Sequence, residues 1–174
     1  MKHLSSILLS IGVILSVVAI ILPQWSVLEA GTDRNAPVYS RHSGLWELCA
    51  KTSKSGQPFN CMAYTDGKNK PKDILVSQIL SIVGTIGLAV GAVMCMMMKP
   101  GYSKLAAGLG VACLTAVLIV YGVVTQGQLG RSFEPEPNAG MPALTTNKVG
   151  ASFWLELSAA VVGLIGLFVP AAKK

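Results

Sequence analysis

Long uninterrupted apolar stretches dominate the hydropathy pattern of this 174-residue chain. Four of them approach or exceed the roughly 20 residues that a helix needs to cross the hydrocarbon core of a bilayer. The first three carry no charged residue, and the fourth carries only Glu156. Because a helix satisfies its own backbone hydrogen bonds in lipid, we expect four transmembrane helices, at residues 4–22, 74–98, 105–125 and 151–169.

The two long segments between these helices differ in character. Residues 23–73, the first outer loop, alternate short β-prone runs with turn-rich stretches, which predicts a small antiparallel sheet. Residues 126–150, the second outer loop, hold three prolines and leave room for one edge strand. The predicted fold is a single domain over residues 1–174, an all-α membrane bundle with small β: a left-handed four-helix transmembrane bundle topped by an extracellular antiparallel β-sheet.

Basic residues predict the orientation of the chain. The short segments outside the two loops hold five lysines and no acidic residue: Lys2, Lys99, Lys104, Lys173 and Lys174. The positive-inside rule therefore places both termini in the cytoplasm of a multi-pass protein. A cleaved signal peptide is the alternative interpretation of residues 4–22, but this run exceeds the usual apolar region of about 7–15 residues and no A-x-A site follows it.

Composition excludes several classes of function. Hydrophobic residues make up 52% of the chain and charged residues 13%, with a net charge of +6. The sequence has no dense basic face with interleaved aromatics, so we expect no nucleic-acid partner. The four apolar stretches make the lipid bilayer the expected partner. The two histidines, His3 and His42, fall on opposite sides of the membrane, and no phosphate loop, metal cluster or nucleophile motif is present. We expect no enzyme activity, no cofactor and no metal.

Four cysteines divide into two pairs. Cys49 and Cys61 lie in the first outer loop, in an oxidising compartment, so a structural disulfide between them is expected. Cys95 and Cys113 lie within membrane spans and are interpreted as small packing residues. Cys95 is also a candidate for palmitoylation, because Lys99 places it near the cytoplasmic surface.

Polar and small residues within the spans suggest contacts between helices. An intramembrane acid is costly, so we expect Glu156 to face the bundle and to bond Gln78, or Tyr121 or Thr125; the alternative is that it reaches interfacial water. Glycines at positions 87 and 91 form a G-x-x-x-G motif that either dimerises two chains or packs neighbouring helices of one bundle. The second interpretation is favoured here.

The first outer loop also carries a family signature. Trp25 follows the first span, Gly44, Leu45 and Trp46 come next, and Cys49 and Cys61 complete the pattern. This arrangement resembles the W…GLW…C…C signature of the claudins, a superfamily that includes the peripheral myelin and epithelial membrane proteins and the calcium-channel gamma subunits. We interpret the signature residues as structural, with the two tryptophans wedging the sheet against the helix tops.

The resemblance implies a protein of cell–cell junctions at the plasma membrane. A claudin-like protein would polymerise side by side in one membrane and make outer-loop contacts with the opposing cell. Its partners would be further copies of itself or related four-span proteins. The assembly would form or regulate a paracellular barrier or ion pathway. The alternative is an auxiliary, gamma-type subunit of an ion channel or receptor. Candidate pore or selectivity residues are Asp66, Lys68 and Lys70, and candidate residues for contact with the opposing cell are Arg131 and Phe133.

Three departures from the claudin pattern suggest a divergent member. Gln78 stands where claudins usually carry arginine, and Glu156 stands where they usually carry small or aromatic residues. The segment after the fourth span, residues 171–174, lacks the PDZ-binding end typical of claudins, so no PDZ scaffold is expected as a partner.

Overall fold

A computed structural model describes residues 4–30, 39–52, 60–64, 72–97, 100–125 and 145–169. Four of its helices are long and apolar enough to cross a membrane. They are α1 (Leu4–Ile21), α2 (Lys72–Met96), α3 (Pro100–Ile119) and α5 (Ala151–Phe168). A short π-helical turn, η2 (Val120–Thr125), continues α3. The expected membrane bundle with a small antiparallel sheet is confirmed.

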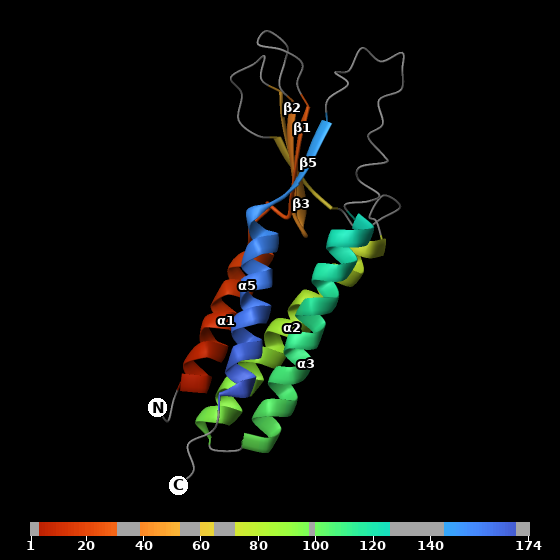
Figure 1. The fold of residues 1–174 in the computed structure, drawn as a ribbon. Coiled ribbons are helices and arrows are strands. Elements are labelled where there is room, and N and C mark those ends of the chain that lie inside the picture. Colours follow the sequence, from red (N-terminus) through yellow and green to blue (C-terminus); the bar gives the residue numbers. More distant parts are fainter. Residues whose placement is uncertain are drawn as a thin grey trace.

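The helices form a bundle with the sheet at one end (Figure 1). Helix α1 packs mainly against α5, and α2 packs mainly against α3; the two pairs meet along α1–α2 and α3–α5. The first residue of α1 and the last of α5 lie at the end opposite the sheet. Apolar side chains on the outside of the bundle, such as Ile14 and Phe168, are exposed as lipid-facing residues would be.

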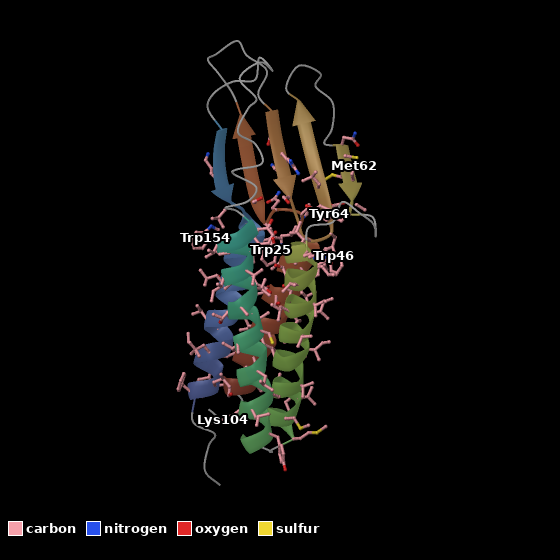
Figure 2. The ribbon with its side chains drawn as sticks, turned by 90° about the vertical axis from the view of Figure 1, so that its right-hand side faces the viewer. Trp25, Trp46, Met62, Tyr64, Lys104 and Trp154 are labelled. Carbon is pink, nitrogen blue, oxygen red and sulfur yellow. A yellow bond between two sulfur atoms is a disulfide. The ribbon has the colours of Figure 1, made fainter. Side chains whose placement is uncertain are left out.

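Helix α3 begins at Pro100, five residues before the expected start at 105. Proline is favoured in the first turn of a helix, because its missing N–H has no helical partner there and its φ angle is already helical. The basic Lys104 therefore lies in the first turns of α3, at the end of the bundle away from the sheet (Figure 2).

The sheet has five antiparallel strands in the order β4-β3-β2-β1-β5. These are β1 (Ser26–Ala30), β2 (Tyr39–Ser43), β3 (Glu47–Thr52), β4 (Asn60–Ala63) and β5 (Thr145–Val149). Strand β5 comes from the second outer loop and pairs with β1, from Ser26 opposite Val149 to Ala30 opposite Thr145. The expected edge strand is therefore present.

The entry into β1 and the exit from β5 are bonded to each other beside the helix ends. The N–H of Gly150 donates to the carbonyl of Trp25, and the N–H of Ser152 donates to the carbonyl of Gln24. The Ser152 hydroxyl also donates to the carbonyl of Leu22 and accepts from the N–H of Gln24. A Cβ atom at position 150 would collide with the Gln24 carbonyl, so this approach requires glycine. These bonds join α1 directly to α5.

Glycines allow α2 and α3 to approach within backbone contact. A Cβ on Gly87 would lie 2.8 Å from the Cα of Gly110, and a Cβ on Gly91 would lie 2.7 Å from the Cβ of Ala107. Both partners belong to the same chain. The G-x-x-x-G motif therefore packs neighbouring helices of one bundle, as favoured from the sequence.

Replacing Gly110 with alanine is expected to destabilise the bundle by about 1–3 kcal/mol, the usual range for an overpacked site. Its Cβ would lie 2.7 Å from the Leu88 nitrogen and 2.8 Å from the Gly84 carbonyl oxygen, and backbone atoms of a packed helix cannot move aside singly. Thermal unfolding of the purified protein in mild detergent measures the loss.

The matched control is Gly108→Ala on the same helix, where a Cβ would meet nothing within 4 Å. This variant should unfold at or above the wild-type temperature, because alanine has the higher helix propensity. Equal losses in the two variants would show that helix propensity, and not the approach of α2 to α3, governs position 110.

Candidate functional site at the junction of sheet and bundle

Trp25 fills the space where the sheet meets the helices. Its side chain is fully buried, and its indole N–H donates to the carbonyl of Ala19 at 2.9 Å. The indole ring lies 4.9 Å, between centroids, from the ring of Tyr121 in η2 and 6.5 Å from that of Phe153 in α5. Such tilted and edge-on aromatic pairs are favourable beyond the area that they bury. Trp25 therefore joins α1, η2 and α5 beneath the sheet.

Leu45 enters the same cluster from the turn between β2 and β3. Leu45 is not part of a strand: β3 begins at Glu47, and the Leu45 side chain is fully buried. It packs with Trp25, Val117 and Tyr121. Burial of this side chain between the helices accounts for its departure from the sheet.

Gly44 permits the turn that directs Leu45 inward. Its N–H donates to the carbonyl of Glu47, and a Cβ at position 44 would lie 2.7 Å from the Cα of Pro23. The carbonyl of Leu45 accepts a hydrogen bond from the side-chain amide of Gln78, with a donor–acceptor distance of 2.6 Å. Gln78 therefore fixes the signature turn to α2.

Ser43, which the sequence did not single out, collects bonds from three directions. Its carbonyl accepts a hydrogen bond from the backbone N–H of Trp25 at 2.9 Å and another from the Tyr121 hydroxyl at 3.3 Å. Its own hydroxyl lies 3.0 Å from the hydroxyl of Tyr64. Burial raises the pKa of Tyr64, while the bond to Ser43 and the positive charge of Arg41 act more weakly in the opposite direction. Tyr64 is thus a neutral hydrogen-bonding group.

Trp46 differs from Trp25 although both were expected to wedge the sheet. Its indole N–H donates to the carbonyl of Ile20 at 2.9 Å, yet the side chain remains 42% exposed. Trp46 and Trp154 lie at the level where the sheet meets the bundle (Figure 2). This is the position at which membrane proteins place their interfacial aromatic belt. Trp46 therefore bonds the end of α1 at the rim of the bundle, while Leu45 fills the buried position beside Trp25.

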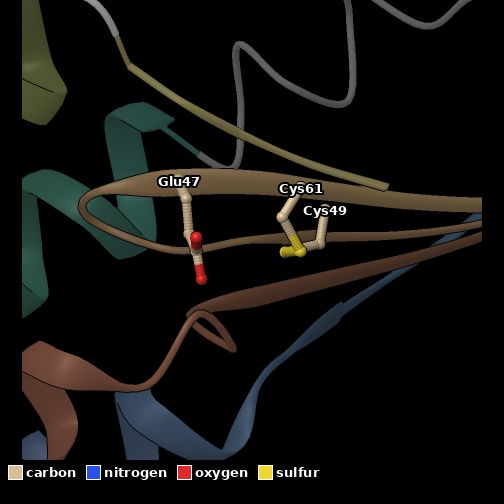
Figure 3. Close-up of side chains that lie close together, drawn as sticks. All are labelled: Glu47, Cys49 and Cys61. Carbon is tan, nitrogen blue, oxygen red and sulfur yellow. A yellow bond between two sulfur atoms is a disulfide. The ribbon is translucent and has the colours of Figure 1, made fainter. Parts of the chain in front are cut away.

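The expected disulfide is present. Cys49 in β3 is the register partner of Cys61 in β4, and their sulfur atoms are bonded at 2.09 Å. Glu47 lies beside this pair (Figure 3), and the three side chains are close enough to suggest a metal site. Both sulfurs are bonded to each other, so neither is a thiolate ligand. The disulfide therefore links β4 covalently to β3.

Glu156 faces the bundle, and two of its three expected partners bond elsewhere. The side chain is fully buried on α5, and neither carboxyl oxygen accepts a well-formed hydrogen bond from the described residues. The Gln78 amide donates to Leu45, and the Tyr121 hydroxyl donates to Ser43. The side chain of Thr125 lies outside the described part. The backbone carbonyls of Leu45 and Ser43 have thus bound two of the three partners that the sequence offered to Glu156.

Two hydroxyl groups from other helices lie close to the carboxyl of Glu156. Ser16 of α1 and Ser81 of α2 lie beside it, and the Ser16 hydroxyl is 2.7 Å from that of Thr85. Sequence reasoning missed this set. A signal was available, because Ser77, Ser81 and Thr85 recur every four residues and therefore share one face of α2.

The remaining predicted site residues lie outside the described part of the chain. They are the candidate pore residues Asp66, Lys68 and Lys70 and the candidate contact residues Arg131 and Phe133. Cys95 and Cys113 are half-buried in α2 and α3 and are not disulfide-bonded.

Comparison with known proteins agrees with the architecture. A family model described as PMP-22/EMP/MP20/Claudin tight junction matches residues 10–169. A comparison with individual curated proteins gave no significant match. The matched region runs from α1 through the disulfide-bonded sheet to the end of α5. The chain therefore belongs to the PMP-22/EMP/MP20/Claudin family of membrane proteins.

Proposed function

We propose that this protein is a claudin-like component of cell–cell contacts, which forms or regulates a paracellular barrier or ion pathway. In this role, copies associate side by side in one membrane, and outer loops meet the opposing cell. The observation that carries the proposal is the sheet, which is tied by a disulfide and anchored by Trp25 on a bundle of four membrane-length helices. A sheet held in this way fixes, relative to the helices, the strands from which the outer loops leave.

The proposed orientation places the sheet outside the cell and both termini in the cytoplasm. The Cys49–Cys61 disulfide favours this orientation, because such bonds persist in oxidising compartments. Lys104 lies at the opposite end of the bundle, where the positive-inside rule places basic residues. The disulfide thus lies at the end proposed to be extracellular, and the basic Lys104 lies at the end proposed to be cytoplasmic.

Expression of the tagged full chain in cells that lack junctions tests the proposal. We expect the protein to concentrate where two expressing cells touch, relative to the free edges of the same cells, and to form intramembrane strands visible by freeze-fracture. Uniform surface distribution, together with co-purification of a pore-forming protein, would instead support an auxiliary subunit of a channel or receptor.

Loop variants make the same experiment specific. Phe133→Ala should reduce enrichment at contacts while leaving surface expression unchanged, since an aromatic side chain in an outer loop is a suitable contact anchor. The matched control is Phe168→Ala, which removes an exposed phenylalanine at the other end of the bundle. If the Phe133→Ala variant is still enriched at cell contacts, Phe133 does not take part in the contact.

A further inference from the structure

The buried carboxyl group of Glu156 stands among oxygen atoms contributed by other helices. Its two carboxyl oxygens and the hydroxyls of Ser77 and Ser81 are buried and make no well-formed hydrogen bond among the described residues, although Ser16 and Ser81 lie close enough to act on the carboxyl as weak donors. Unsatisfied buried polar atoms are rare in folded proteins. Two of these four atoms lie on one face of α2, and the other two belong to Glu156 of α5.

Helix geometry places these groups at one depth in the membrane. Ser16 lies five residues before the end of α1, and Glu156 lies five residues after the start of α5. Both are thus about 7.5 Å below the helix ends near the sheet, at 1.5 Å per residue. Ser81 of α2 lies beside the Glu156 carboxyl and hence at its level, and Ser77 lies one turn of α2 closer to the sheet.

Charge makes this arrangement unusual. The other charged residues of the described helices are Lys72 and Asp73 at the start of α2 and Lys104 near the start of α3. Lys72 and Lys104 are exposed, and Lys104 lies at the far end of the bundle. An ionised carboxylate buried without a counter-charge is strongly disfavoured. Something that carries one positive charge must therefore accompany Glu156 whenever it is ionised.

We propose that Glu156, Ser16 and Ser81, with Ser77 above them, form a binding site for a small monovalent cation, Na⁺. Carboxylate and hydroxyl oxygens are hard ligands, the type that hard cations prefer. A single carboxylate is neutralised by a monovalent ion, whereas a divalent ion would leave a net positive charge in the membrane. The ion would connect α1, α2 and α5 at the level below the Trp25 cluster.

Sodium-dependent stability of the purified full chain tests the site. At about pH 8, where an ordinary carboxyl is ionised, replacing choline with Na⁺ at constant ionic strength should raise the unfolding temperature. For a dissociation constant on the order of 10 mM, about 150 mM Na⁺ should raise it by roughly 3–6 °C. Direct binding of ²²Na⁺ should approach about one ion per chain, the stoichiometry of a single site.

Variants assign the effect to these residues. Glu156→Gln keeps the shape of the side chain without its charge, and it should abolish both the temperature shift and ²²Na⁺ binding. Ser81→Ala should weaken binding and require more Na⁺ for the same shift. The matched control is Thr115→Ala, because this hydroxyl bonds only to the Val111 carbonyl of its own helix among the described contacts; it should keep the full response.

The proposal is overturned if wild-type protein unfolds at the same temperature in Na⁺ and choline and binds no ²²Na⁺. Stabilisation by acid with no response to Na⁺ would also overturn it and would show that a proton neutralises Glu156. Equal stabilisation of wild type and Glu156→Gln would place the sodium effect elsewhere. These outcomes do not depend on the proposed role at cell contacts, because each is measured on isolated protein.

Discussion

Replacing Trp25 with alanine is expected to lower the free energy of unfolding by about 3–5 kcal/mol, the range for a large buried aromatic. The side chain is fully buried, packs against Tyr121 and Phe153, and donates its N–H to Ala19. Its loss would leave a cavity where three helices meet the sheet. Thermal and denaturant unfolding in detergent, followed by circular dichroism, measure the change.

A matched control is available on α5. Trp154 is 56% exposed, so Trp154→Ala should change the stability by no more than about 0.5 kcal/mol. Trp25→Phe should fall between the two, because it keeps much of the ring but loses the bond to Ala19. If Trp25→Ala and Trp154→Ala behaved alike, the buried cluster would not be what holds the sheet on the bundle.

Removal of the disulfide is the second large effect. The paired change Cys49→Ala and Cys61→Ala should cost about 3 kcal/mol, because a bridge across 12 residues restricts the unfolded chain. The loss should concentrate in the sheet, since β4 is an edge strand paired only with β3 among the described strands. Hydrogen exchange, read strand by strand with mass spectrometry, checks this location.

The free cysteines supply the control for this experiment. Cys95→Ala and Cys113→Ala remove thiols in α2 and α3 and should leave exchange in β3 and β4 unchanged. Reduction of the wild-type protein should reproduce the effect of the paired change. Wild-type protection of β4 after reduction would mean that strand pairing alone holds this edge.

Much of the fold follows from the sequence because the responsible signals are local. An apolar run of membrane length predicts a helix without knowledge of its neighbours, as it does for α1 and α2. The disulfide required only that Cys49 and Cys61 share an oxidising compartment. The edge strand β5 was expected because the prolines of the second outer loop exclude regular structure only from its middle.

The site was harder to predict because it depends on competition between partners. Gln78 was expected to bond Glu156, but the carbonyl of Leu45 enters the bundle and accepts the hydrogen bond of the Gln78 amide. That carbonyl is there because Leu45 leaves the strand pattern to be buried beside Trp25. Backbone acceptors of a buried turn carry no residue-type signal, so the sequence did not reveal this competitor.

The hydrogen bonds between Gln24 and Ser152 also constrain how the chain is made. Strand β1 is among the first outer segments to leave the ribosome, yet its partner β5 follows more than a hundred residues later. Until α5 has left the translocon, one edge of β1 stays unpaired and the Trp25 ring lacks its contact with Phe153. Assembly must therefore finish after translation, and a nascent chain stalled before its last helix would offer an open β edge to chaperones and quality control.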